Sequence, residues 1–236
     1  MAIDDMIQGK ILDTVFDKNT LMTLYSLESA KIIKALESPI STGKEAVVFR
    51  ARSPEGAFLA VKLYLVKNCN YKKMFTYLQG DSRFAGIKNN KQSIVFAFCA
   101  KENRNLQRAY ELGINCPRPL AYKDNVLVEE FIGDEEGNPA PRMKDHAPED
   151  PEAAYAILKK YIEVLWKGGL VHGDLSEYNI LISNEVPWVI DMSQSVLISH
   201  PNAREYLKRD IHNINKYFEK RKVKTSDFFD NLIKEA

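Results

Sequence analysis

Two acids and an amide in the second half of the chain have the side chains that phosphate chemistry requires. Asp174 and Asn179 lie five residues apart in a short polar stretch, and Asp191 follows twelve residues later, after an apolar run. One carboxylate can orient a nucleophilic hydroxyl or water, while the amide and the second carboxylate hold Mg²⁺ against ATP phosphates. Mg²⁺ needs few protein ligands, because phosphate oxygens and water complete its shell. The pattern predicts phosphoryl transfer; for Asp174 alone, an ordinary turn is the alternative.

A lysine in the first half of the chain is also a candidate for binding phosphate. Lys62 lies inside the apolar run 57–66, where its ammonium group is costly to bury unless it is paired. Either this run is an edge strand and Lys62 reaches solvent, or Lys62 binds ATP phosphates and a helix carboxylate steadies it. The helix predicted over 101–112 offers Glu102 and Glu111, and we favour Glu102 because it lies in the first turn.

A short polar loop precedes that lysine. Its residues Ser41, Thr42, Gly43 and Lys44 lie between two predicted strands. Glycine allows backbone amides to approach phosphate closely, and the two hydroxyl groups add donors. The loop matches neither common glycine-rich phosphate motif, so a plain hairpin turn is the alternative, and Lys62 on the next strand favours phosphate binding.

The elements that must position these residues change in kind along the chain. Residues 17–37 predict a helix that passes into a strand before Pro39. Further strands are predicted over 46–51, 57–66 and 125–132, and further helices over 153–167, 203–219 and 225–235. The first half is therefore rich in sheet and the second half is mostly helical, with a natural hinge near 129–141.

Composition excludes several classes of protein. The 236 residues are 45% hydrophobic and carry a net charge of +1, which gives no global attraction to nucleic acid or membrane. The three cysteines form no CxxC pair, as in a reducing cytosolic protein. The chain lacks a signal-peptide pattern and an apolar stretch of ~20 residues, so we expect a cytoplasmic protein without a membrane span.

Four segments in this order, STGKEA, AVKLY, VHGDLSEYN and VIDMSQ, resemble the Rio-type atypical serine/threonine protein kinases. The resemblance is strongest to the type-one subfamily in its compact archaeal form. It implies an α+β, trimmed two-lobe protein-kinase-like fold with an extra N-terminal helical element over 1–31. The N-lobe would cover 32–130, with an inserted flexible loop at 67–98, and the C-lobe would cover 131–236.

The resemblance also assigns roles. It makes Asp174 the catalytic acid, Asn179 and Asp191 the metal ligands, and Lys62 and Glu102 the ion pair. It places Ser41, Thr42, Gly43 and Lys44 over the phosphates, and it puts Glu130 and Ile132 at the hinge, where backbone groups would bind adenine. The implied cofactors are ATP and Mg²⁺, with Mn²⁺ as a second possible cation.

The implied function is serine/threonine phosphorylation, including autophosphorylation, in maturation of the small ribosomal subunit. ATP hydrolysis through a phosphorylated Asp191 is a second activity of such proteins. The expected partner of this monomer is a precursor of the small ribosomal subunit. The segment 67–98 holds six basic residues and one acidic residue, a composition that suits either a solvated loop or contact with RNA. A small-molecule phosphotransferase of the aminoglycoside or choline kinase kind and a non-catalytic scaffold are the alternatives.

Three departures bear on this reading. No APE motif follows Asp191, so the usual peptide-binding segment of protein kinases is missing. Ser193 stands where the related motif has glycine, which would stiffen the turn around Asp191. Glu129 precedes the hinge where an apolar residue is commoner, and its carboxylate must be paired or partly solvated.

Overall fold

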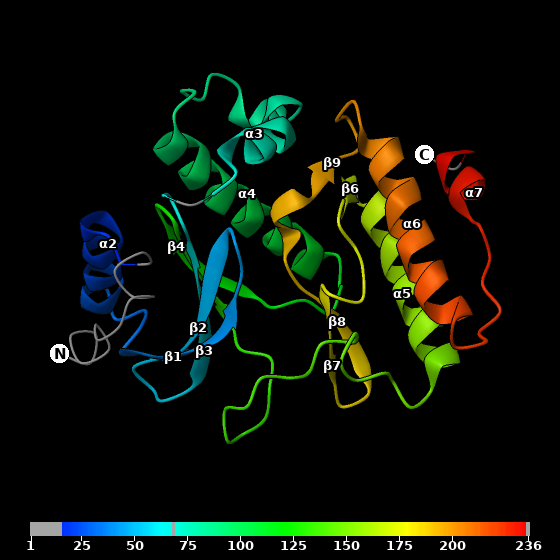
Figure 1. The fold of residues 1–236 in the computed structure, drawn as a ribbon, viewed down its shortest axis with the longest axis horizontal. Helices are drawn as coiled ribbons and strands as arrows, with labels where there is room; N and C mark the ends of the chain where they lie inside the picture. Colours follow the sequence, from blue (N-terminus) through cyan, green and yellow to red (C-terminus); the bar gives the residue numbers. More distant parts are fainter. Residues whose placement is uncertain (1–15, 68, 235–236) are drawn as a thin grey trace. The chain divides into compact units, whose positions relative to one another are not determined.

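The computed structural model describes residues 16–67 and 69–234, in which the chain divides into two compact units (Figure 1). Among these residues, the first unit contains 16–67, 69–78, 84–103 and 118–139, and the second contains 79–83, 104–117 and 140–234. Residues 1–15 of the expected N-terminal element, Asn68 of the expected insertion and Glu235 of the last expected helix lie outside the described residues.

The first unit is built on a five-stranded antiparallel sheet. Its strands are β1 (Ala35–Thr42), β2 (Ala46–Arg52), β3 (Phe58–Tyr64), β4 (Pro119–Lys123) and β5 (Val126–Glu130), in the order β1-β2-β3-β5-β4. β3 is the central strand, so the edge-strand interpretation of Lys62 is wrong.

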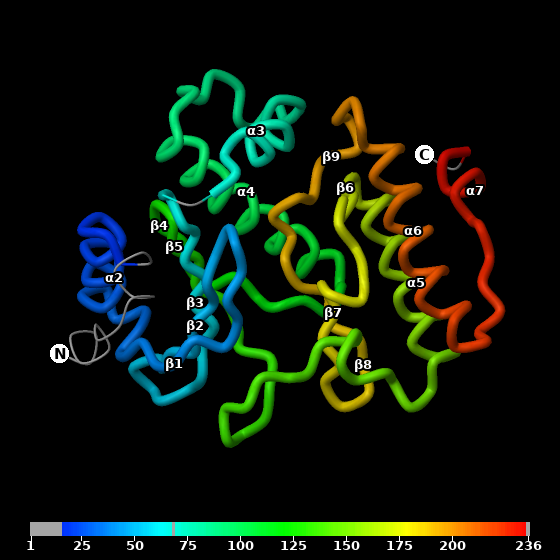
Figure 2. Tube along the Cα trace, viewed as in Figure 1, coloured from blue at the N-terminus to red at the C-terminus, as the bar shows by residue number. Residues whose placement is uncertain are grey.

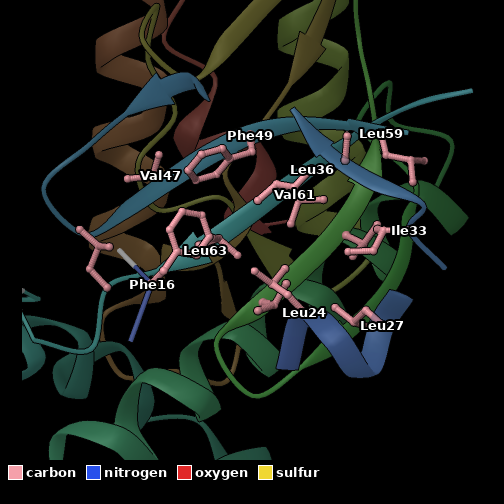
Figure 3. Packing of buried hydrophobic residues seen from close by; sticks show 14 residues of the cluster. Phe16, Leu24, Leu27, Ile33, Leu36, Val47, Phe49, Leu59, Val61 and Leu63 are labelled. Atoms are coloured by element: carbon pink, nitrogen blue, oxygen red, sulfur yellow. The ribbon is translucent and has the colours of Figure 1, made fainter. Parts of the chain in front are cut away.

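One face of this sheet is covered by helix α2 (Lys18–Ser29), which begins at an Asp17 N-cap. Every second residue of β3 faces this side, including Val61 and Leu63, and these pack with Leu24 and Leu27 of the helix (Figure 3). Because strand side chains alternate, Lys62 and Tyr64 project from the opposite face. All residues of β3 from Leu59 onward are buried, as a central strand covered on both sides requires.

The helix expected over 101–112 is longer than predicted, because α4 runs from Lys91 to Glu111. Asn90 caps its start by accepting from the Ser93 amide at 2.9 Å, while the Asn90 side chain donates to Ser93 Oγ at 3.0 Å. This exchange satisfies donors of the first turn, much as a capping box does. The signal is visible in the sequence as Asn-x-x-Ser before an apolar helical face.

The inserted segment 67–98 is not a plain loop. It holds α3 (Tyr71–Gln79), the short 3₁₀ helix η2 (Ser82–Phe84) and the first turns of α4. Asn70 caps α3 through the Lys73 amide at 3.2 Å, and Met74, Tyr77 and Leu78 are its buried residues. Helix α3 was not predicted from the sequence, although its nine residues form an amphipathic pattern. The flexibility of the segment stays a prediction.

The second unit is mainly helical. Helices α5 (Pro151–Lys167) and α6 (Ala203–Glu219) lie side by side, and α7 (Phe229–Lys234) lies against α6 (Figure 2). Two small antiparallel pairs complete it, β6 (Leu170–Val171) with β9 (Val196–Leu197) and β7 (Ile180–Ser183) with β8 (Val186–Val189), together with the 3₁₀ helix η3 (Met192–Gln194).

The architecture is α+β and mixes one antiparallel sheet with packed helices, as expected. Among the residues that the structure describes, no helix combines the length and apolar character that a membrane crossing requires.

We expect Leu24→Ala to lower the free energy of unfolding by about 2–5 kcal/mol, because Leu24 is fully buried between α2 and the sheet and truncation leaves a cavity. Met22→Ala is the matched control on the same helix, since the Met22 side chain is 61% exposed. Urea titration followed by circular dichroism measures both. Equal shifts of the two variants would mean that α2 does not belong to the folded core.

Candidate active site

A buried ion pair joins the sheet to helix α4 in the first unit. Lys62 Nζ lies 2.8 Å from Glu102 Oε1, and Glu102 is 1% exposed. The second carboxylate oxygen of Glu102 accepts a hydrogen bond from the Tyr64 hydroxyl. Tyr64 packs edge-on against Phe98, one turn before Glu102, and Lys62 Nζ lies 5.2 Å from the Tyr64 ring centre. Both oxygens of Glu102 are therefore held in place, and Glu102, not Glu111, is the carboxylate that pairs with Lys62.

The loop expected to bind phosphate forms the tip of the β1–β2 hairpin. Thr42, Gly43 and Lys44 are exposed, and the Gly43 amide donates to the Ala46 carbonyl at 2.9 Å. A Cβ added at Gly43 would lie 3.2 Å from that carbonyl oxygen, a tight approach that favours glycine. The loop is a closed hairpin tip whose exposed backbone can reach a ligand.

Of the two residues expected at the hinge, Glu130 ends β5 and Ile132 lies two residues beyond it. The Glu130 amide donates to the Arg118 carbonyl at 2.9 Å, and Glu130 Oε2 accepts from the Arg118 amide at 3.2 Å. This pairing commits the Glu130 N–H to the contact with Arg118. Ile132 is buried, and Glu129, which precedes Glu130, is half-buried.

The acids of the second unit come together because of a tight hairpin. β7 pairs with β8 so that Ile180 lies opposite Val189, and the turn between them places Asn184 and Glu185 at positive φ, as two-residue hairpins require. The hairpin brings Asn179, just before β7, to the same end as Asp191, two residues after β8. The Ile190 amide donates to the Asn179 carbonyl at 3.0 Å and secures this end.

Two amides orient the Asp174 carboxylate. Asn179 Nδ2 lies 2.9 Å from the Asp174 carbonyl and 3.3 Å from Asp174 Oδ2, and Gln194 Nε2 lies 3.0 Å from the same Oδ2. Because its nitrogen is directed to Asp174, Asn179 turns its own side-chain oxygen away from it. Asp174, Asn179 and Asp191 are all half-buried, so a ligand can reach them.

Asp191 has an unusual backbone conformation. Its φ of 63° and ψ of 68° lie in the left-handed region, which is uncommon for residues other than glycine. The Asp191 carboxylate accepts from Ser193 Oγ at 2.5 Å and caps η3 through the Ser193 amide. The serine that replaces the usual glycine is buried and bonded directly to Asp191, which agrees with a stiffened turn.

His172 contacts the backbone of both the Asp174 loop and the Asp191 loop. Its Nδ1 accepts from the Asp174 amide at 3.2 Å, and its Nε2 faces the Ile190 carbonyl at 3.2 Å. A carbonyl can only accept, so the proton of the neutral ring lies on Nε2. One buried imidazole thus ties the backbone before Asp174 to the backbone before Asp191.

A buried acid on helix α6 holds the loop around Asp174. Asp210 accepts from the Gly173 amide at 2.7 Å and from the Leu175 amide at 2.9 Å. Burial raises the pKa of Asp210 to about 7, against the opposing effect of these two amides and of Arg209. Gly173 itself has φ of 81°, and a Cβ there would meet the Gln194 carbonyl at 2.9 Å, so the loop requires glycine.

Sequence reasoning missed the residues that hold the acids in place, namely Tyr64, His172, Gln194 and Asp210. Tyr64 carries a readable signal, because it lies two residues after Lys62 and a strand places it on the same face. Asp210 carries none, since an acid in a charged amphipathic helix gives no sign that it is buried.

Comparisons with known proteins converge on one family. The family model of the RIO domain matches residues 47–230. The RIO-type serine/threonine-protein kinase Rio1 of Methanocaldococcus jannaschii is 46% identical over 91% of this chain and 73% of its own length. The protein of the same name from Haloferax volcanii is 41% identical over 92% of this chain and 75% of its own length. Human serine/threonine-protein kinase RIO1 is 34% identical over 94% of this chain, which spans 40% of the human protein.

Solved structures agree with these relatives. The crystal structure of a Rio2 kinase–ADP/Mg²⁺–phosphoaspartate complex from Chaetomium thermophilum matches with a TM-score of 0.70 and 25% identity. The alignment covers 90% of this chain and 65% of that chain, which is just under two thirds of its length. The five-stranded sheet and the helical unit therefore form a kinase-like fold.

We expect Asp210→Asn to change how stability depends on pH. A carboxyl group whose pKa is raised on folding stabilises the folded state fully below its unfolded pKa of ~4, and this contribution is lost as pH rises through about 7. The variant cannot titrate, and it loses one of two buried amide contacts, at a cost of about 1–3 kcal/mol at low pH. The stability difference between parent and variant should therefore shrink from pH 4 to pH 7.

Urea denaturation at several pH values measures this difference, with Asp145→Asn as a control on an exposed side chain of the same unit. A parent-to-variant difference that stays constant over this range would contradict the raised pKa of Asp210.

Proposed function

The chain belongs to the family of RIO-type serine/threonine-protein kinases and is an ATP-dependent protein kinase, and we propose that it transfers the γ-phosphoryl group of Mg-ATP to a serine or threonine hydroxyl. The observation that carries the proposal is the orientation of Asp174. Two side-chain amides, from Asn179 and Gln194, converge on its Oδ2, and Asp210 and His172 hold its backbone.

In this proposal Asp174 accepts the proton of the attacking hydroxyl. A carboxylate suits this step when its position is set before the substrate arrives, because a base that is already oriented toward the hydroxyl takes its proton without first reorienting. The hydrogen bonds from two amides supply that preorganisation.

Asn179 and Asp191 fit the ligand set of a magnesium ion. Together they offer one amide oxygen and one carboxylate, which are hard donors of the kind that Mg²⁺ and Mn²⁺ take. The contact of Asn179 Nδ2 with the Asp174 carbonyl directs the amide oxygen outward, as a metal ligand requires. When bound, the cation would neutralise charge on the phosphates.

In the first unit we assign Lys62 to the ATP phosphates, with Glu102 as its partner. An ammonium group held at one distance from a fixed carboxylate can contact phosphate without leaving that partner. The hairpin tip 41–44 would cover the phosphates, and backbone groups of Glu130 and Ile132 would bind adenine.

Labelled ATP tests the proposal. With γ-labelled ATP and Mg²⁺ or Mn²⁺, the parent should place acid-stable label on serine or threonine. Asp174→Asn and Asp191→Asn should each lose about 10²-fold or more in rate, because each removes a group that acts in the transition state. Asp145→Asn, an exposed acid of the same unit, should leave the rate unchanged.

Other outcomes select the alternatives. Hydroxylamine-labile label together with free phosphate would assign ATP hydrolysis through an aspartyl phosphate as the main activity. Near-parental turnover in Asp191→Asn would remove this residue from the metal site, and absence of all turnover in the parent would favour a non-catalytic scaffold.

We further propose that the partner of this monomer is a cytoplasmic precursor of the small ribosomal subunit, bound through the inserted segment. The support is local charge, because Lys72, Lys73, Lys88 and Lys91 are exposed there although the whole chain is nearly neutral. Three cysteines that are free and buried suit a reducing compartment.

Reversing Lys72, Lys73 and Lys88 to glutamate should weaken binding to small-subunit precursor RNA. It should also flatten the plot of log affinity against log salt by about 0.7–0.9 for each lost phosphate contact. Lys208, Lys220 and Lys224, reversed together, are the control, since they are exposed on the second unit. Filter binding at several salt concentrations measures both, and equal slopes for the two triple variants would exclude the inserted segment as the RNA contact.

A further inference from the structure

A buried asparagine on helix α4 holds the turn that follows Asp191. Asn105 is fully buried in the second unit, and its Nδ2 donates to the carbonyl groups of Met192 and Ser195, each at 2.9 Å. Its Oδ1 accepts from the Arg83 guanidinium at 2.9 Å. The amide can be placed in one orientation only, because two carbonyl acceptors lie on one side and a donor lies on the other.

The two carbonyls belong to the backbone that sets the conformation of Asp191. Met192 begins η3, and its carbonyl also accepts from the Ser195 amide at 3.2 Å. Asp191 itself lies in the left-handed region, where a residue other than glycine persists only if its surroundings hold it there. Ser193 holds the Asp191 side chain, and Asn105 holds the backbone that follows, so these two residues share that task.

Asn105 is in turn held by the inserted segment. Arg83 binds both carboxylate oxygens of Asp81, through Nε at 2.9 and 3.1 Å and through NH2 at 2.6 Å. The same NH2 group donates to Asn105. Asp81 is 3% exposed, so this pair is largely shielded from water, and its geometry is set by two planar groups that match each other.

We propose that Asn105 is a positioning residue for the metal-binding loop, and that Asp81 and Arg83 set its orientation, so that the inserted segment tunes the affinity for Mg²⁺. This inference rests on the proposed function, because it takes Asp191 as a metal ligand. Asn105 and Arg83 contact neither metal nor nucleotide in this scheme; they act through the backbone of Met192 and Ser195.

The inference is tested with Asn105→Leu, which keeps the approximate shape of the side chain and removes both donors. Mg²⁺ is titrated at fixed ATP while phosphoryl transfer is followed. We expect the half-saturating Mg²⁺ concentration to rise about tenfold and kcat to fall, whereas ATP binding measured in EDTA stays at the parental value. Gln107→Leu is the matched control, since Gln107 is an exposed amide two residues along the same helix, and it should behave like the parent.

If Asn105→Leu fails to fold, Arg83→Leu tests the inference instead. The Arg83 side chain is 20% exposed, and its removal leaves Asn105 in place. It should shift the Mg²⁺ dependence in the same direction by a smaller factor. Arg83→Lys should not restore it, because an ammonium group cannot bind both carboxylate oxygens in a planar pair and Asn105 together.

The outcomes separate this inference from the proposed function. Parental Mg²⁺ dependence in folded Asn105→Leu and Arg83→Leu proteins overturns the inference. If Asp191→Asn, measured alongside them, also keeps the parental Mg²⁺ dependence, the metal assignment of the proposed function fails as well. If Asp191→Asn alone loses it, only the positioning role is wrong.

Discussion

The pairing of a charge buried at the centre of the sheet is the constraint on which the first unit depends. Lys62 lies on a strand covered on both faces, and Glu102 is its partner from helix α4. Removing one member of a buried pair typically costs about 3–5 kcal/mol, because the other charge is left unpaired. α4 must therefore present a carboxylate among its buried residues, and Tyr64 holds that carboxylate at its second oxygen.

The same requirement, that buried polar groups be bonded, gives the second unit its rigid loops. His172, Asp210 and Asn105 are each buried, and each bonds to backbone groups beside Asp174 or Asp191. Backbone amides and carbonyls in a loop have no ladder partners, so side chains must satisfy them. The bonds that meet this need also fix the position of the acids, which joins stability to the proposed chemistry.

The kinase assignment depends on this site as much as on the fold. Related folds carry unrelated activities, so a sheet with a helical unit does not by itself identify a protein kinase. The relatives reported above are named as protein kinases, and the Asp174 carboxylate of this chain is oriented by two side-chain amides, as the proposed phosphoryl transfer requires. The hydrogen bond from Ser193 to Asp191 shows how the chain accommodates a residue larger than glycine beside a strained backbone.

The sequence by itself indicated the candidate site residues, four of the five strands of the sheet, the long helices and the family, because spacing along a turn or a strand is local information. Asp174, Asn179 and Lys62 were readable for that reason. The long start of α4 was missed only because its Asn90 cap was overlooked, although it too is local. The central position of β3, the burial of Asp210 and the links from Arg83 through Asn105 to Met192 were decided by the tertiary structure alone. The hydrogen bonds of Arg83 with Asn105, of Leu175 with Asp210 and of Asn105 with Met192 join residues 22, 35 and 87 positions apart. No local pattern specifies which distant polar groups meet when water is excluded.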